Sequence, residues 1–89
     1  LYYLFYFFYT FFMTKISIVN FKTMDKLLKK LGFQPIRQKG SHIFLCHQDG
    51  RTPTVPNHHG RDLARPLIRE ILREIELTPE QYKKELEKL

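Results

Sequence analysis

The sequence is poor in cysteine, and it contains no apolar run long enough to cross a membrane as a helix. Cys46 is the only cysteine, so no disulfide framework is available and a reducing, cytoplasmic location is expected. The most apolar stretch, LYYLFYFFYTFF, is shorter than the roughly 20 residues that a transmembrane helix needs. It also lacks the basic start and the small-residue cleavage site of a secretory signal. No membrane partner is therefore expected.

Methionine is absent from the first position, although Met13 and Met24 lie inside the chain. We interpret residues 1–23 as a hydrophobic aromatic leader outside the domain, with Met24 as a candidate natural start and residues 24–89 as the domain. A membrane anchor and an unusual edge strand are the alternatives for the leader. A free run this aromatic is also an aggregation hazard.

Acidic residues are scarce in the middle of the chain. The formal net charge of the 89 residues is +6. Residues 26–69 contain nine basic and two acidic residues, whereas residues 70–89 contain four basic and six acidic ones. The positive charge is therefore concentrated in the middle of a single small domain, which favours a polyanionic partner.

Hydrophobic periodicity after Met24 predicts a helix followed by three short strands. Leu27, Leu28 and Leu31 repeat at helical spacing, and Gly32 supplies the stop. The predicted strands are FQPIR (33–37), SHIFLCH (41–47) and TPTVP (52–56), with turns at QKG (38–40) and QDGR (48–51) between them.

Two further helices are predicted after the strands. One begins near Pro66 and has an apolar stripe made of Leu67, Ile68, Ile71, Leu72 and Ile75. The other follows TPEQ (78–81), which has the pattern of a capping box. The fold class is therefore α+β in the order α-β-β-β-α, with a three-stranded antiparallel sheet and helices packed on one face.

A histidine, His42, follows Gly-Ser at the start of the second predicted strand. Imidazole groups titrate near neutral pH, so His42 is a candidate general acid or base that takes or gives a proton. The candidate phosphate-binding residues around it are Arg37, Lys39, Gly40, Ser41 and Arg51. The alternative is that His42 is an ordinary half-exposed strand histidine.

The loop NHHGRD (57–62) is the second basic segment. Arg61 and Arg65 are candidates for phosphate contacts. His58 is a candidate for a phosphate contact or for shaping the loop, with proton transfer as the alternative.

The histidines and the cysteine do not have the spacing of a metal site. Cys46 and His47 are neighbours on a strand and point to opposite faces, and His58-His59 has no partner at zinc spacing. No metal and no other cofactor is therefore expected.

The ordered set KGSH, DGR, TVP, His58, Gly60, Leu63 and LIREIL resembles the HicA family, which are small ribonuclease toxins of prokaryotic toxin–antitoxin pairs. The resemblance covers about residues 24–82. It implies a double-stranded-RNA-binding-domain-like fold and metal-independent cleavage of mRNA by the histidine after Gly-Ser. It also implies neutralisation by a HicB-type antitoxin.

The sequence departs from the family pattern at three positions. His59 falls where a glycine is more usual, while His58 matches a family position. Glycines often found near the start of the second helix and in the turn after it are replaced by Pro66 and Glu76. These departures affect the expected local backbone and leave the GSH segment intact.

The favoured hypothesis is therefore an endoribonuclease toxin with His42 as its general acid or base. A nucleic-acid-binding module without catalysis is the alternative, because the same basic face suits the phosphates and 2′-hydroxyls of RNA. A degenerate toxin relative that only binds an antitoxin is a third hypothesis, and the intact GSH and TVP segments argue against it.

Overall fold

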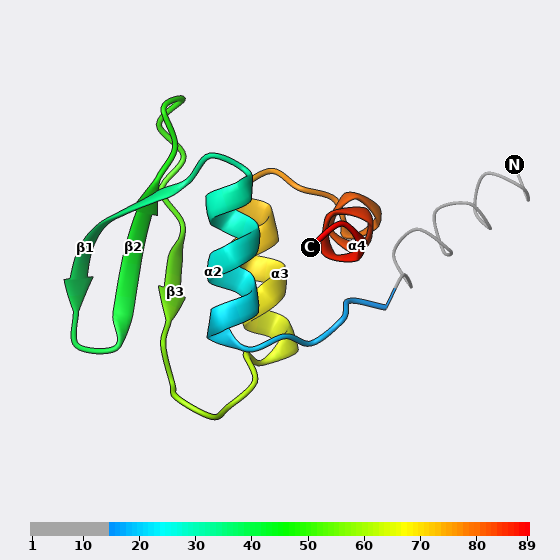
Figure 1. Ribbon diagram of the computed structural model, residues 1–89, viewed down its shortest axis with the longest axis horizontal. Helices are drawn as coiled ribbons and strands as arrows, with labels where there is room; N and C mark the ends of the chain where they lie inside the picture. Colours follow the sequence, from blue (N-terminus) through cyan, green and yellow to red (C-terminus); the bar gives the residue numbers. More distant parts are fainter. Residues whose placement is uncertain (1–14) are drawn as a thin grey trace, which may run out of the picture.

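The structure is a computed structural model, and it describes residues 15–89 (Figure 1). Its elements in chain order are α2 (Phe21–Lys30), β1 (Gln34–Lys39), β2 (His42–Cys46), β3 (Thr54–Pro56), α3 (Arg65–Glu74) and α4 (Pro79–Glu87). The strands form one antiparallel sheet in the order β1-β2-β3. The predicted α+β fold class is confirmed, and the α-β-β-β-α order is consistent with a double-stranded-RNA-binding-domain-like fold.

The hydrophobic core lies between one face of the sheet and the helices. Leu45 of β2 and Val55 of β3 are fully buried there. They belong to the same cluster as Met24, Leu27 and Leu28 of α2 and Ile68, Ile71 and Leu72 of α3. Figure 1 shows the sheet on one side of α2 and α3, with β1 at its outer edge. Each fully buried aliphatic side chain contributes about 1.5–3 kcal/mol, so this packing holds the layers together.

A β-bulge in β1 decides which side chains reach the face opposite the core. The register shifts between Pro35 and Arg37, so Ile36 is the extra residue, and its side chain is 64% exposed. Beyond the bulge, Arg37 pairs with Phe44 and Lys39 pairs with His42. Residues directly opposite each other in an antiparallel pair share a face. The bulge therefore brings both cations to the side of His42.

Helices α2 and α3 end in the same way, although only one of them uses glycine. After α2, the Phe33 N–H donates to the Leu28 carbonyl at 2.9 Å, and Gly32 has a φ of +95°. After α3, the Leu77 N–H donates to the Leu72 carbonyl at 2.9 Å, and Glu76 has a φ of +58°. Both are Schellman motifs, whose left-handed residue is usually glycine. Glu76 thus takes the left-handed backbone conformation that favours glycine at this position.

Residues 15–23 take part in the packed structure. Ile16 is only 3% exposed and belongs to the core. The Asn20 side chain caps α2 by accepting the Thr23 N–H at 3.0 Å, and the Leu63 N–H donates to the Val19 carbonyl at 2.8 Å. A boundary at residues 23 and 24 would divide α2 and remove its cap. The rest of the predicted leader, residues 1–14, lies outside the described residues.

Helix α4 also contacts the N-terminal segment, residues 15–23, through a hydrogen bond. Its predicted capping box is confirmed, with reciprocal hydrogen bonds between Thr78 and Gln81. The buried Tyr82 donates its hydroxyl to the Ser17 carbonyl at 2.8 Å, and burial raises the pKa of this phenol to about 12.

No helix within residues 15–89 has the length and apolar character to span a membrane.

Candidate nucleic-acid interface

The segment KGSH forms a two-residue hairpin turn between β1 and β2. Gly40 has a φ of +58° and Ser41 does not have a positive φ, as a type II′ turn requires. The turn therefore lies at Gly40-Ser41, one residue beyond the predicted QKG turn, and Lys39 is the last residue of β1. This geometry seats Lys39 directly opposite His42 at the tip of the hairpin.

His42 lies on the face of the sheet opposite the core. Ile43 and Leu45 point to the core, so the alternation along β2 gives His42 and Phe44 the other face. The His42 side chain is exposed and makes no hydrogen bond or ion pair with any of residues 15–89. Its imidazole is therefore available to a ligand.

Arg37 lies beside His42 on the same face. Its guanidinium carbon is 4.4 Å from the centroid of the Phe44 ring, a cation–π contact that holds the side chain against the sheet. Its N–H groups make no ion pair with a carboxylate among residues 15–89, and they remain able to donate to a phosphate.

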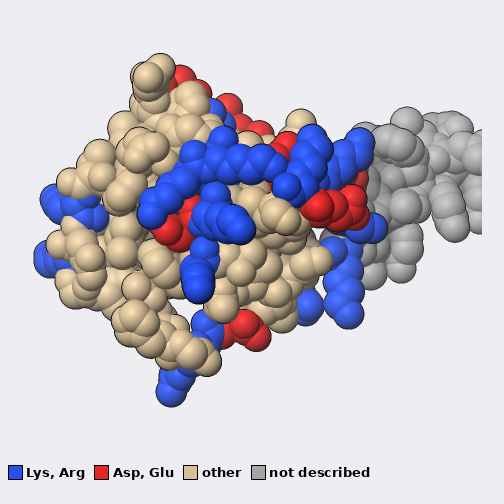
Figure 2. All heavy atoms as spheres, in the orientation of Figure 1, with Lys and Arg blue, Asp and Glu red and all other residues tan. Residues whose placement is uncertain are grey.

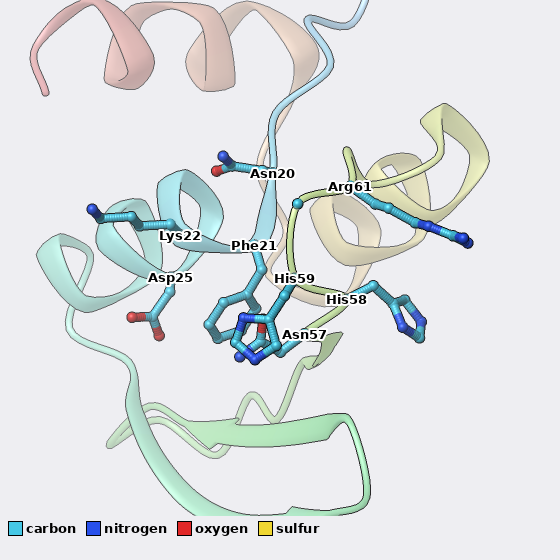
Figure 3. A pocket seen from close by; sticks show the side chains of 9 residues that line it. Asn20, Phe21, Lys22, Asp25, Asn57, His58, His59 and Arg61 are labelled. Atoms are coloured by element: carbon cyan, nitrogen blue, oxygen red, sulfur yellow. The ribbon is translucent and has the colours of Figure 1, made fainter.

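The loop of residues 57–62, which we call the histidine loop, is joined to the GSH turn by a backbone hydrogen bond. The Asn57 N–H donates to the Ser41 carbonyl at 2.6 Å, directly after Pro56, which pairs with His42. Figure 3 shows His58 and Arg61 pointing away from Lys22 and Asp25, on the other side of the loop. The fold therefore brings residues 57–61 close to His42, although they are distant in sequence.

The basic side chains at this end of the sheet have no partners within residues 15–89. We call Lys39, His42, His58 and Arg61 the free end of the sheet. All four are exposed, and none of their side chains forms a hydrogen bond, ion pair or ring contact with another described residue. Figure 2 shows basic side chains on the β1 side and around the loop below β3, apart from the larger group over α2. Unpaired cations near an exposed imidazole suit a phosphate backbone.

Arg51 lies at the opposite end of β2 and is held by contacts within the protein. Its Nε donates to both carboxylate oxygens of Asp49, at 3.0 and 2.8 Å, and its Nη1 donates to the Ile75 carbonyl. The guanidinium also lies 5.0 Å from the centroid of the Phe33 ring. The hydrogen bond from Arg51 lowers the pKa of Asp49 from its ordinary value of 3.8 to about 2. The structure therefore does not bring Arg51 to the predicted site around His42.

His47 completes this second cluster, which we call the held end and define as His47, Asp49 and Arg51 with Phe33. The Nδ1 of His47 accepts the Asp49 N–H at 3.1 Å, and its ring centroid is 5.1 Å from that of Phe33. A Cβ on Gly32 would lie 3.0 Å from the His47 Nε2. The close approach of His47 to the C-terminal end of α2 therefore also depends on glycine at this position. His47 is thus packed into the structure.

Arg65 is also away from the free end. Its Nε donates to the Ile16 carbonyl at 3.2 Å, so it fastens the N-terminal segment to the start of α3. It lines a separate open pocket with Lys15 and Lys83. Of the predicted phosphate ligands, the fold places Arg37, Lys39, Gly40 and Ser41 beside His42, and it places His58 and Arg61 on the loop that is hydrogen-bonded to Ser41. It leaves Arg51 and Arg65 elsewhere.

No group of three or more His, Cys, Asp or Glu side chains in residues 15–89 is arranged to hold a metal ion. Cys46 is half-buried, and its thiol donates to the His47 carbonyl at 3.2 Å.

Phe44 and the start of α2 were not predicted from the sequence as parts of this surface. Phe44 was detectable, since it alternates in phase with His42 along β2. Asn20 and Phe21 were not considered as part of a helix, because residues 1–23 were assigned to the aromatic leader. The signal for them was the preference for Asn as a helix N-cap, just ahead of an apolar helical pattern.

The fold and site define a small basic α+β domain of the double-stranded-RNA-binding-domain-like type. A family model described as "HicA toxin of bacterial toxin-antitoxin" matches residues 21–77. The chain therefore belongs to the HicA toxin family, and it is the toxin component of a bacterial toxin–antitoxin system. A search of curated proteins returned no match. The family match begins at Phe21, the first residue of α2.

Proposed function

We propose that this toxin is a metal-independent endoribonuclease that cleaves mRNA, with His42 as the general acid or base. The observation that carries the proposal is the exposed, unpartnered imidazole of His42 at the tip of a hairpin, directly opposite Lys39. Arg61 and His58 lie on the loop that is hydrogen-bonded to the same turn. The family supplies the context of a toxin, and the chemistry rests on these residues.

The reaction needs little from the protein because the RNA brings its own nucleophile. The ribose 2′-oxygen forms a bond to phosphorus, and the bond from phosphorus to the 5′-oxygen breaks. His42 takes the proton of the 2′-hydroxyl, and the leaving 5′-oxygen receives a proton from the imidazolium or from water. The products are a 2′,3′-cyclic phosphate and a 5′-hydroxyl. Lys39 and Arg37 stabilise the charge that develops on the phosphate oxygens.

The partner expected for such a toxin is a HicB-type antitoxin protein. The free end and the face around Phe44 form an uncovered surface among residues 15–89, and a cover on this surface would keep RNA from His42. Saturating the toxin with its antitoxin should therefore abolish cleavage. Full activity in the saturated complex would contradict this mode of neutralisation.

The alternative function is a nucleic-acid-binding module that lacks catalysis, since the same unpaired cations suit binding alone. To separate the two, the 89-residue chain and its His42→Ala variant are incubated with a defined RNA in excess chelator, and the product ends are analysed. Cleavage by the parent alone, with 2′,3′-cyclic phosphate ends, supports the nuclease. Salt-dependent binding by both proteins without cleavage by either supports the binding module.

A further inference from the structure

A second feature lies behind the histidine loop. It is an open pocket of about 390 Å³ between the start of α2 and residues 57–61. Asn20, Phe21, Lys22 and Asp25 line it from the helix, and the loop closes its other side (Figure 3). The volume is within the range of roughly 300–1,000 Å³ that is usual for ligand sites.

The walls of this pocket are fixed by hydrogen bonds on both sides. The loop is joined to the GSH turn through the Asn57 N–H and the Ser41 carbonyl, and it is joined to the N-terminal segment by a bridge between Asn20 and Asp62. Phe21 is partly buried and packs against the core. The pocket is therefore formed without a ligand, and it shares a wall with the segment beside His42.

The side chains in the pocket suit a flat ring with a polar edge. Phe21 and His59 both line the pocket, so its walls carry an aromatic ring and an imidazole (Figure 3). The side-chain amide of Asn57 makes no hydrogen bond within residues 15–89, so it can both donate and accept. Asp25 carries a carboxylate, although Lys29 pairs with it at 2.8 Å. A carboxylate repels a phosphate, but it accepts hydrogen bonds from the amino groups of nucleobases.

We propose that this pocket holds one unpaired nucleobase of the RNA, stacked on Phe21 and His59, while the neighbouring phosphate lies at the free end. The inference rests on the proposed RNA substrate. Lys22, at the rim of the pocket, contacts the backbone on the side away from His42. Bases that stack on aromatic side chains must first be unpaired, as in single-stranded recognition by other RNA-binding modules. The pocket therefore makes a single strand the preferred ligand, despite the double-stranded-RNA-binding-domain-like fold.

The test measures binding to RNA that cannot be cut. Single strands of about eight nucleotides with 2′-O-methyl groups lack the nucleophile, and each carries 2-aminopurine at one position. The same strands paired with their complements serve as the duplex probe. Binding of the 89-residue chain is followed by anisotropy, and stacking is followed by quenching of the 2-aminopurine fluorescence. We expect the single strand to bind more tightly than the duplex and to be quenched.

Three variants with one matched control examine the pocket itself. Phe21→Leu keeps an apolar side chain but removes the ring, and it should weaken single-strand binding by about ten-fold and abolish the quenching. His59→Ala should act in the same direction and involves an exposed side chain, so it decides the question if Phe21→Leu fails to fold. Lys22→Ala should weaken binding a few-fold, whereas Lys26→Ala, one turn along α2 and outside the pocket, should leave it unchanged.

The outcomes separate the pocket from the nuclease. If Phe21→Leu and His59→Ala bind as the parent does, and the duplex competes equally well, the base pocket is overturned even when His42-dependent cleavage is intact. If the variants weaken binding but unmodified RNA is never cleaved by the parent, the pocket stands and the proposed nuclease activity fails.

Discussion

The two ends of strand β2 carry the same residue type in opposite circumstances. The side chain of His42 at the free end is exposed and has no hydrogen-bond or ion-pair partner within residues 15–89. His47 at the held end accepts a hydrogen bond from Asp49 and packs against Phe33. The cations beside them differ likewise, since Lys39 is unpaired and Arg51 has three kinds of contact. A basic residue that is left unpaired beside an exposed imidazole is the better candidate for function, because its charge is still available to a ligand.

The largest expected effect comes from replacing each of the two histidines by alanine in turn. His42→Ala should lower the cleavage rate by about 10²–10⁴-fold, the usual contribution of a general acid or base, with an unchanged thermal midpoint. His47→Ala should lower the thermal midpoint but keep the rate per folded molecule. Equal losses of rate in both variants would contradict the assignment of catalysis to the free end alone.

The N-terminal segment supports the loop at the free end, so its removal should cost stability. A chain that begins at Met24 loses the buried Ile16, the Asn20 cap and the Val19–Leu63 hydrogen bond. The expected loss in the free energy of unfolding is about 3 kcal/mol or more, from apolar burial and helix capping together. A chain that begins at Lys15 is the control, and urea titration measures the difference between the two.

Glu76 offers the opposite change, a gain in stability next to the held end. It occupies the left-handed position of the Schellman motif after α3, where a side chain costs about 1 kcal/mol. Glu76→Gly should therefore raise the free energy of unfolding by about 1 kcal/mol, less the entropy that glycine gains in the unfolded chain. Arg69→Gly, in the middle of the same helix, should destabilise the protein and serves as the control.

Neutralising one cation at each end should separate affinity from stability. Lys39→Ala should weaken RNA binding a few-fold and reduce the slope of log affinity against log salt by about 0.7, with little change in the thermal midpoint. Arg51→Ala should lower the thermal midpoint and leave that slope unchanged. Binding titrations at several salt concentrations decide the matter, and a reduced slope for Arg51→Ala would place RNA at the held end.

The smallest expected effect is a pH dependence at the held end. Asp49 has a folded-state pKa of about 2, below its ordinary value of 3.8, because Arg51 donates to its carboxylate. Its contribution to stability is present above about pH 4 and is lost as the pH falls through the folded-state pKa near 2. Asp49→Asn should therefore show a flatter decline in stability between these values. An identical acid profile for parent and variant would mean that the pair contributes nothing.

Most of the element order was predictable from local patterns. The leucine spacing of α2, the stop at Gly32, the alternation through Ile43 and Leu45 and the capping box at Thr78 are short-range signals that the structure confirms. The start of α2 was placed too late, because the aromatic run upstream concealed the Asn20 cap. The exact turn was also missed by one residue, since QKG and GS both have turn-forming residues.

The sequence by itself determined that a histidine follows a glycine-bearing turn in a basic α+β domain, since turn chemistry and hydrophobic periodicity act over a few residues. Only the tertiary structure decided which cations accompany His42. The bulge at Ile36 turns Arg37 and Lys39 to its face, and the hydrogen bond between Asn57 and Ser41 brings the loop of His58 and Arg61 beside it. Arg51 and Arg65 were equally plausible from the sequence. Long-range packing placed them against Ile75 and Ile16 instead, a choice that depends on contacts between distant segments and leaves no local signal.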